Sequence, residues 1–229
     1  MAASRYFSPA FFEFFEELSR NNNREWFQHN KSRYEDEVRT PMLRFIADFA
    51  PRLRAIGKHF DADPRPTGGS MMRIYRNLRF SRDKTPYRTN AAAAFHHRDA
   101  DFGATPAFYL SLSPAEAFAG VGLFHPTPDT LEKMRRSIVA RPAIWKRAVG
   151  DKKFLKRFNI EGDSLTRPPR GFDPEHPLIE DIKRKDFIGG AQFTRAEVCS
   201  PRFLELYTEL CKSASPYVKF ITEAVGLRW

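Results

Sequence analysis

The sequence predicts an α+β fold: one domain with a mostly antiparallel central sheet, flanked by helices from the N-terminal and C-terminal parts of the chain. Three observations lead to this prediction. Apolar residues recur at helical spacing near both ends, and the central region has strand-like runs separated by turn residues. The 229 residues, of which 41% are hydrophobic, can fill a large core. Because no repeat or linker marks a boundary, we expect residues 1–229 to form a single domain.

The N-terminal part predicts helices that follow one another closely. Residues 8–20 begin with a Ser-Pro pair, which starts helices, and continue with phenylalanines at helical spacing. The three asparagines of residues 21–23 would end this helix and cap a second one from Arg24. Pro41 is expected to end or kink the second helix, and a third follows to about residue 53.

The central region predicts the sheet. Residues 61–70 are rich in proline and glycine and form a loop. Ser70 would then cap a short helix over residues 71–78, whose apolar stripe leaves the arginines of this segment outside it. A strand over about residues 87–97 follows. Residues 107–124 predict an antiparallel hairpin with its turn at SPAE.

The C-terminal half predicts mainly helices. Residues 127–141 begin with capping residues and form a helix that packs on the sheet. Another short helix follows Pro142, and residues 166–177 contain too many prolines to be regular. From Pro201 onward, apolar residues at helical spacing indicate two helices divided by Pro216.

A basic segment, residues 73–88, is the strongest functional signal. Its six cations against Asp83 give +5, which is half of the chain's net charge of +10. Arginine pairs with phosphate or carboxylate through two parallel hydrogen bonds, so we expect an anion-binding site here. Its candidate residues are Arg73, Arg76, Arg79, Ser81, Lys84, Tyr87 and Arg88. The alternative is that the arginines pair with acids of the glutamate-rich first helices and hold elements of the fold together.

Two smaller motifs are further candidates for ligand binding. Arg24 and Trp26 could flank a ligand, although a helix junction with a core tryptophan is the favoured interpretation. Gly120 and Gly122 lie on one side of a predicted strand and leave a notch. A ligand or another part of the backbone would fill this notch, and the sequence favours neither.

Metal and cofactor chemistry find little support in the sequence. His97 and Asp99 share one face of a predicted strand, and with His125 or His176 they would resemble a two-histidine, one-carboxylate iron site. Because this pattern is short and common, we predict no metal. The chain contains neither a nucleophile elbow nor a phosphate-binding glycine loop. We therefore expect no cofactor, and enzymatic activity stays an open question.

The sequence also indicates the compartment. Two cysteines, Cys199 and Cys211, are too few for a disulfide framework, so we expect reduced thiols. Near the N-terminus, glutamates occur before any apolar run of signal-peptide length. The longest nearly uncharged stretch, residues 102–128, contains prolines and glycines that suit strands and turns better than a membrane helix. We expect a cytoplasmic protein without a membrane partner.

Two motifs together resemble the signatures of a known family. Residues 21–27 read NNNREWF and residues 73–89 read RIYRNLRFSRDKTPYRT. These segments, with GVGLFHP at 120–126 and PPRGF at 168–172, are similar to the family called domain of unknown function family 2461. No activity is established for that family, so the resemblance implies no catalytic residue. The chain has Asn77 where the family's pattern usually has aspartate.

These observations predict an anion-binding site for a phosphorylated small molecule or a nucleotide, built on residues 73–88. The same cations could instead contact successive phosphates of a nucleic acid. A structural or protein-interaction domain, with its arginines in internal ion pairs, is the third alternative. If the protein is an enzyme, stabilisation of negative charge by this segment is the mechanism that the residues favour.

Overall fold

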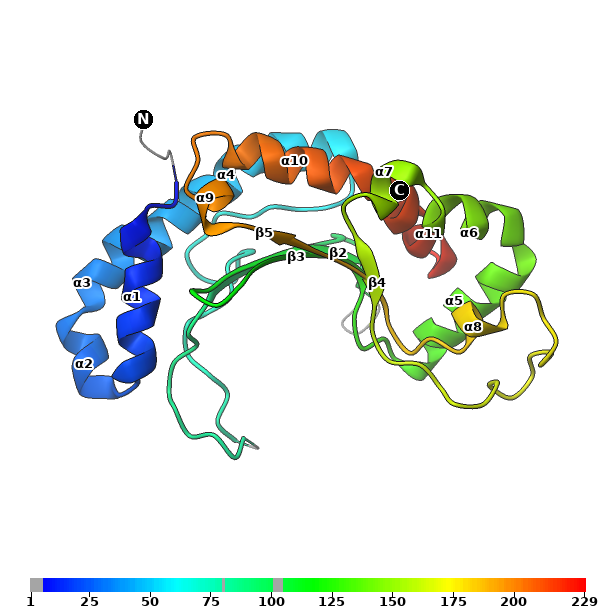
Figure 1. The fold of residues 1–229 in the computed structure, drawn as a ribbon, viewed down its shortest axis with the longest axis horizontal. Coiled ribbons are helices and arrows are strands. Elements are labelled where there is room, and N and C mark those ends of the chain that lie inside the picture. Colours follow the sequence, from blue (N-terminus) through cyan, green and yellow to red (C-terminus); the bar gives the residue numbers. More distant parts are fainter. Residues whose placement is uncertain (1–5, 80, 101–104) are drawn as a thin grey trace.

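The structure is a computed structural model that describes residues 6–79, 81–100 and 105–229. It confirms the α+β prediction, because helices pack on a five-stranded sheet in which every neighbouring pair of strands is antiparallel. The strand order is β1-β2-β3-β5-β4. Helices α4 and α10 lie along one face of the arched sheet, with α11 beside them (Figure 1).

The N-terminal helices form one wall of the molecule. Their bounds are α1 Pro9–Arg20, α2 Arg24–His29, α3 Lys31–Arg33, the π-helix η1 Tyr34–Arg39 and α4 Thr40–Ile56. The predicted starts at Pro9 and Arg24 are confirmed. Pro41 was expected to end or kink the second helix, and it does not end it, because the helical backbone continues from η1 into α4. The Thr40 N–H bonds to the Glu35 carbonyl, five residues back, and Pro41 then lies in the first turn of α4, where its missing N–H costs little.

The strands confirm the predicted hairpin and extend the sheet beyond it. Their bounds are β1 Ala91–His96, β2 Ala107–Leu112, β3 Ala117–Leu123, β4 Asn159–Glu161 and β5 Phe187–Phe193. Side chains that point toward the helices are buried, as Leu110 and Val121 show. The large aromatic side chains between α1, α4 and α10 complete this core, with Phe45 packed against Phe203 and Tyr207.

The remaining helices include the predicted ones and three short helices, α7, α8 and α9, that were not predicted. Their bounds are α5 Pro128–Ala140, α6 Pro142–Val149, α7 Lys152–Leu155, α8 Ile179–Ile182, α9 Arg195–Val198, α10 Phe203–Ser213 and α11 Ser215–Ala224. The predicted helix at 127–141, the short helix after Pro142 and the irregular loop at 166–177 are confirmed. The C-terminal pair divides at Ala214, with Pro216 in the first turn of α11.

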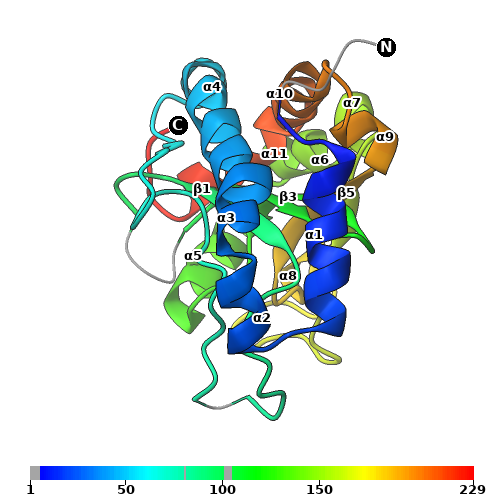
Figure 2. The ribbon, with the colours of Figure 1, turned by 90° about the vertical axis from the view of Figure 1, so that its left-hand side faces the viewer.

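The predicted helix over residues 71–78 is wrong, because this segment is extended. Met71 pairs with Ala93 and Tyr75 pairs with Tyr87, both in antiparallel bridges. Apolar residues at 71, 74, 75 and 78 fit a helical stripe. The backbone groups of Met72, Ile74 and Arg76 instead bond to residues 86–92, in the chain that leads into β1. We call the described residues of 71–90 the basic arm, and residues 76–79 and 81–85 the arm tip. The basic arm reaches below α2 in both views (Figure 1 and Figure 2).

Candidate functional site

The arm tip is held closed by its own charges. The Arg76 guanidinium forms an ion pair with Asp83 and donates hydrogen bonds to the hydroxyls of Thr85 and Ser81. The Asp83 carboxylate also accepts the Thr85 backbone N–H at 2.9 Å. The Arg76 hydrogen bond, together with the Thr85 donors, lowers the pKa of Asp83 to about 2. Arg76 and Ser81, both candidate anion ligands, are therefore engaged inside the arm tip.

The other cations of the basic arm differ in their surroundings. Lys84 Nζ donates to the Leu78 carbonyl at 3.1 Å and closes the arm tip further. Arg79 and Arg88 are exposed, as is Arg82. The basic segment thus combines cations that hold the arm tip with cations that face solvent.

Tyr87 anchors the basic arm to the helices. It is 2% exposed, and its ring stacks on Phe27 of α2 with 4.1 Å between centroids. The Asn22 side chain binds the Tyr87 backbone on both sides, accepting its N–H at 3.0 Å and donating to its carbonyl at 2.9 Å. Burial, with a smaller contribution from Tyr75, raises the pKa of the Tyr87 hydroxyl. The candidate residue Tyr87 thus lies at a packed junction between the basic arm and α2.

The asparagine and tryptophan motif serves this junction. Asn23 caps α2 by accepting the Trp26 backbone N–H at 2.9 Å, as the sequence predicted. The Trp26 ring is half-buried and lies 5.6 Å from the Phe14 ring. Arg24 is exposed at the start of α2. The geometry agrees with the interpretation of a helix junction for Trp26.

The glycine notch in β3 is filled by the protein itself. Gly122 has φ +112°, and a Cβ placed there would lie 2.1 Å from the Phe187 carbonyl oxygen. A Cβ at Gly120 would lie 3.0 Å from the Phe118 ring. Close approach of the neighbouring strand therefore accounts for Gly122, because a side chain would clash with the β5 backbone.

A groove of about 560 Å³ lies between the N-terminal helices and the basic arm. One wall consists of residues from α2, α3 and η1, and the other consists of residues 66–69 and 71–75. We call this cavity the arm groove. Its lining combines cations and hydroxyls with apolar side chains, which is typical of small-molecule sites. Of the candidates predicted from the sequence, Arg73 lines it.

The helical wall of the arm groove carries charged side chains on successive turns. Glu35 and Arg39 form an ion pair, with Arg39 Nη1 lying 2.9 Å and 3.1 Å from the two carboxylate oxygens. Arg39 also donates to the Pro66 carbonyl at 3.0 Å, which ties the helix to the opposite loop. Tyr34 and Lys31 continue this wall. π-Helical segments such as η1 are rare in proteins, and those that occur often lie at functional sites.

Two cations in the arm groove have no protein partner among the described residues. Neither the Lys31 nor the Arg73 side chain contacts an acceptor in the part of the chain that the structure describes. The lining has three cations, Lys31, Arg39 and Arg73, and one carboxylate, that of Glu35. Arg39 is paired with this carboxylate. Burial raises the pKa of the Tyr34 hydroxyl to about 12, so this hydroxyl stays a hydrogen-bond donor at neutral pH. The arm groove can therefore neutralise and hydrogen-bond an anion.

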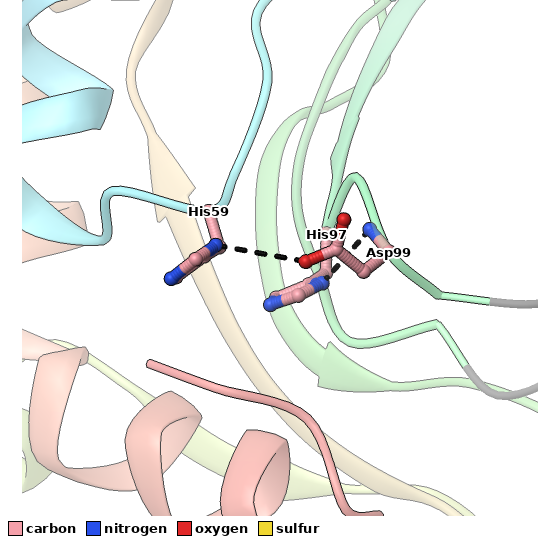
Figure 3. A group of neighbouring side chains, drawn as sticks. All are labelled: His59, His97 and Asp99. Atoms are coloured by element: carbon pink, nitrogen blue, oxygen red, sulfur yellow. Dashed lines mark hydrogen bonds and ion pairs between the residues drawn. The ribbon is translucent and has the colours of Figure 1, made fainter.

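A second cluster of polar groups lies at the end of β1 (Figure 3). Candidate ligand atoms of His59, His97 and Asp99 lie within 4.8 Å of one another. The His97 ring donates through Nε2 to the Arg228 carbonyl at 2.7 Å and accepts the Asp99 N–H through Nδ1 at 3.2 Å. The two imidazole rings are stacked, with an interplanar angle of 18°. Because a ring nitrogen's lone pair lies in the plane of its ring, the lone pairs of the two rings are nearly parallel and do not converge on one point. This arrangement fits a role in holding the C-terminal residues better than metal binding.

The other histidines named from the sequence lie elsewhere. His125 Nδ1 is 3.3 Å from the Asp186 carboxylate, and His176 Nδ1 accepts the Leu178 N–H at 3.1 Å. His59 was not among the sequence candidates, because it precedes the strand and meets His97 through folding alone. Cys199 and Cys211, the two cysteines of the chain, are free thiols, as predicted.

The sequence comparisons agree with these motifs. A model of the family described as "Conserved hypothetical protein (DUF2461)" matches residues 10–220. The chain belongs to this family. The DUF2461 match includes both walls of the arm groove, the basic arm and the sheet. No curated protein matches the chain. Within the described residues, no helix is long and apolar enough to cross a membrane.

In this DUF2461 chain, the helical wall of the site was the part that the sequence did not reveal. Lys31, Glu35 and Arg39 recur every four residues, a spacing that places them on one side of a helix. That signal predicts a charged helix face. Only the fold shows that residues 66–75 lie opposite this face.

Proposed function

We propose that the arm groove binds an anionic ligand, either a phosphorylated small molecule or a nucleotide. The observation that supports this proposal is the pair of cations, Lys31 and Arg73, that line one groove and have no described protein acceptor. Both side chains are exposed, and they line the same groove as a single carboxylate, that of Glu35, which Arg39 already engages. Two unpaired cations facing one cavity favour an external anion.

The chemistry of the lining suits such a ligand. Arg73 offers a planar fork for two oxygens of a phosphate, and Lys31 adds a compact charge. Met71 and Met72 supply apolar surface for the uncharged part of the ligand. The volume is within the usual range for small-ligand sites.

Nucleic-acid binding is the second candidate, and it rests on a different set of residues. Arg82, Lys84 and Arg88 are exposed on the basic arm outside the arm groove. If these residues bind successive phosphates, affinity for an oligonucleotide will fall steeply as salt rises, whereas a ligand held by one phosphate will show a shallow dependence.

Isothermal titration with inorganic phosphate and adenosine monophosphate tests the proposal. We expect saturable binding that weakens about tenfold in Arg73→Gln, because a hydrogen bond to a charged group is lost. Arg82→Gln is the matched control, since it removes an exposed arginine of the same arm outside the groove. No saturable binding, or equal losses in the two variants, would contradict the proposal.

A further inference from the structure

The extended segment that lines the arm groove has an unpaired edge. Alternate residues of an antiparallel strand direct their N–H and C=O groups to opposite edges. The even-numbered residues of this segment bind the chain that leads into β1. The bonds are Ala94 N–H to Ser70 O, Met72 N–H to Ala92 O, Arg88 N–H to Ile74 O and Arg76 N–H to Pro86 O. The N–H and C=O groups of Met71, Arg73 and Tyr75 have no partner among the described residues.

The arm groove runs along this edge. Five consecutive residues, 71–75, line it, whereas a cavity over one face of a strand would touch every second residue. Two of these residues, Met71 and Tyr75, pair with Ala93 and Tyr87, which are 0% and 2% exposed beneath the helices. Paired residues point to the same side of a sheet. Arg73 lies between them and lines the same groove as Lys31 and Arg39.

We propose that an extended acidic peptide binds in the arm groove as an added strand. Its backbone would bond to the free groups of Met71, Arg73 and Tyr75, as peptides do when they add to an open sheet edge. Its carboxylates on the helix side would lie beside Lys31 and Arg39, which line the same groove. This inference rests on the anion preference proposed above. It adds a backbone complement that a small phosphate does not use.

Charge selects this partner over a second copy of the chain. Pairing two copies along this edge would place two Arg73 side chains near each other in a groove that already carries Lys31 and Arg39. The chain as a whole carries a net charge of +10. Cations on an open edge oppose such self-pairing, and they attract acidic side chains.

A fluorescence-anisotropy titration of the full chain tests the inference. The probe is a labelled hexapeptide of alternating valine and glutamate with capped ends. One control peptide replaces glutamate by lysine. A second control is N-methylated at every residue, so that it keeps the carboxylates and loses every backbone donor. Amide hydrogen exchange at Arg73 and Tyr75 is measured with and without the acidic peptide.

We expect the wild-type chain to bind the acidic peptide. The Arg73→Gln variant should bind it about tenfold more weakly. Each control peptide should bind the wild-type chain at least tenfold more weakly than the acidic peptide does. Slower exchange at Arg73 and Tyr75 with the peptide present would locate the added strand. Equal binding of the N-methylated or lysine peptide would overturn the inference, and so would unchanged exchange at these amides. A dimer that protects the same amides without peptide would also overturn it. If phosphate binds and the acidic peptide does not, the inference fails while the proposed function stands.

Discussion

The arm tip and the arm groove use cations of one basic segment in opposite ways. In the arm tip, Arg76 meets Asp83, and the pair closes a turn. In the arm groove, Arg73 lies only three residues earlier and has no described acceptor. The difference lies in where acids are placed, since both arginines belong to the same charged stretch. A dense run of cations is therefore not a single binding site. The role of each cation depends on the group that it contacts.

The junction beneath both regions gives the largest expected effect. Phe27 is 1% exposed and stacks on Tyr87, so Phe27→Ala should lower the free energy of unfolding by about 3–5 kcal/mol. It should also loosen the basic arm, and with it both regions. Urea denaturation measures the change. Phe124→Ala is the control, because the Phe124 side chain is 68% exposed. A loss below about 1 kcal/mol would mean that the basic arm does not depend on this contact.

The Asn22 clamp should have a smaller effect. Asn22→Ala removes both hydrogen bonds to the Tyr87 backbone and should lower the free energy of unfolding by about 1–3 kcal/mol. Asn21→Ala is the matched control, because the one described bond of the Asn21 side chain goes to the Glu17 carbonyl at the exposed end of α1. Thermal unfolding of the two variants gives the comparison. Equal melting temperatures would show that Asn22 does not hold the basic arm.

The charge pair of the arm tip should be visible in the pH dependence. Arg76 and the Thr85 donors lower the pKa of Asp83 from 3.8 to about 2 in the folded protein. The carboxylate therefore stabilises the fold above pH 3.8, and this contribution disappears as the pH falls through about 2. Melting temperatures of the wild type and Asp83→Asn should converge over this range. If their difference stays constant down to pH 2, Asp83 is not held by Arg76.

Local sequence signals predicted the elements whose residues agree with their surroundings. The Ser-Pro start of α1, the capping residues of α5 and the β2–β3 hairpin are examples. Residues 71–78 were predicted wrongly because their apolar spacing is that of a helix, whereas pairing with residues 86–94 makes the segment extended. Such pairing leaves no mark in a short window of sequence.

The candidate site was predicted only in part for the same reason. Arg73 was named from the charge of its segment, and it lines the arm groove. Lys31 and Arg39 were not named, because the charged residues around them in the sequence are typical of a solvent-exposed helix face. The partners of Arg76 lie within its own segment, yet the turn that joins them to it forms only in the fold.

The most direct measurement compares the phosphate affinities of Arg73→Gln and Arg76→Gln by titration, together with amide exchange at Thr85. The account predicts that Arg73→Gln loses about tenfold in affinity and leaves the Thr85 exchange rate unchanged. Arg76→Gln should keep its affinity and exchange faster at Thr85, since the ion pair with Asp83 is lost. The reverse pattern, or equal losses of affinity, would contradict the division between arm groove and arm tip.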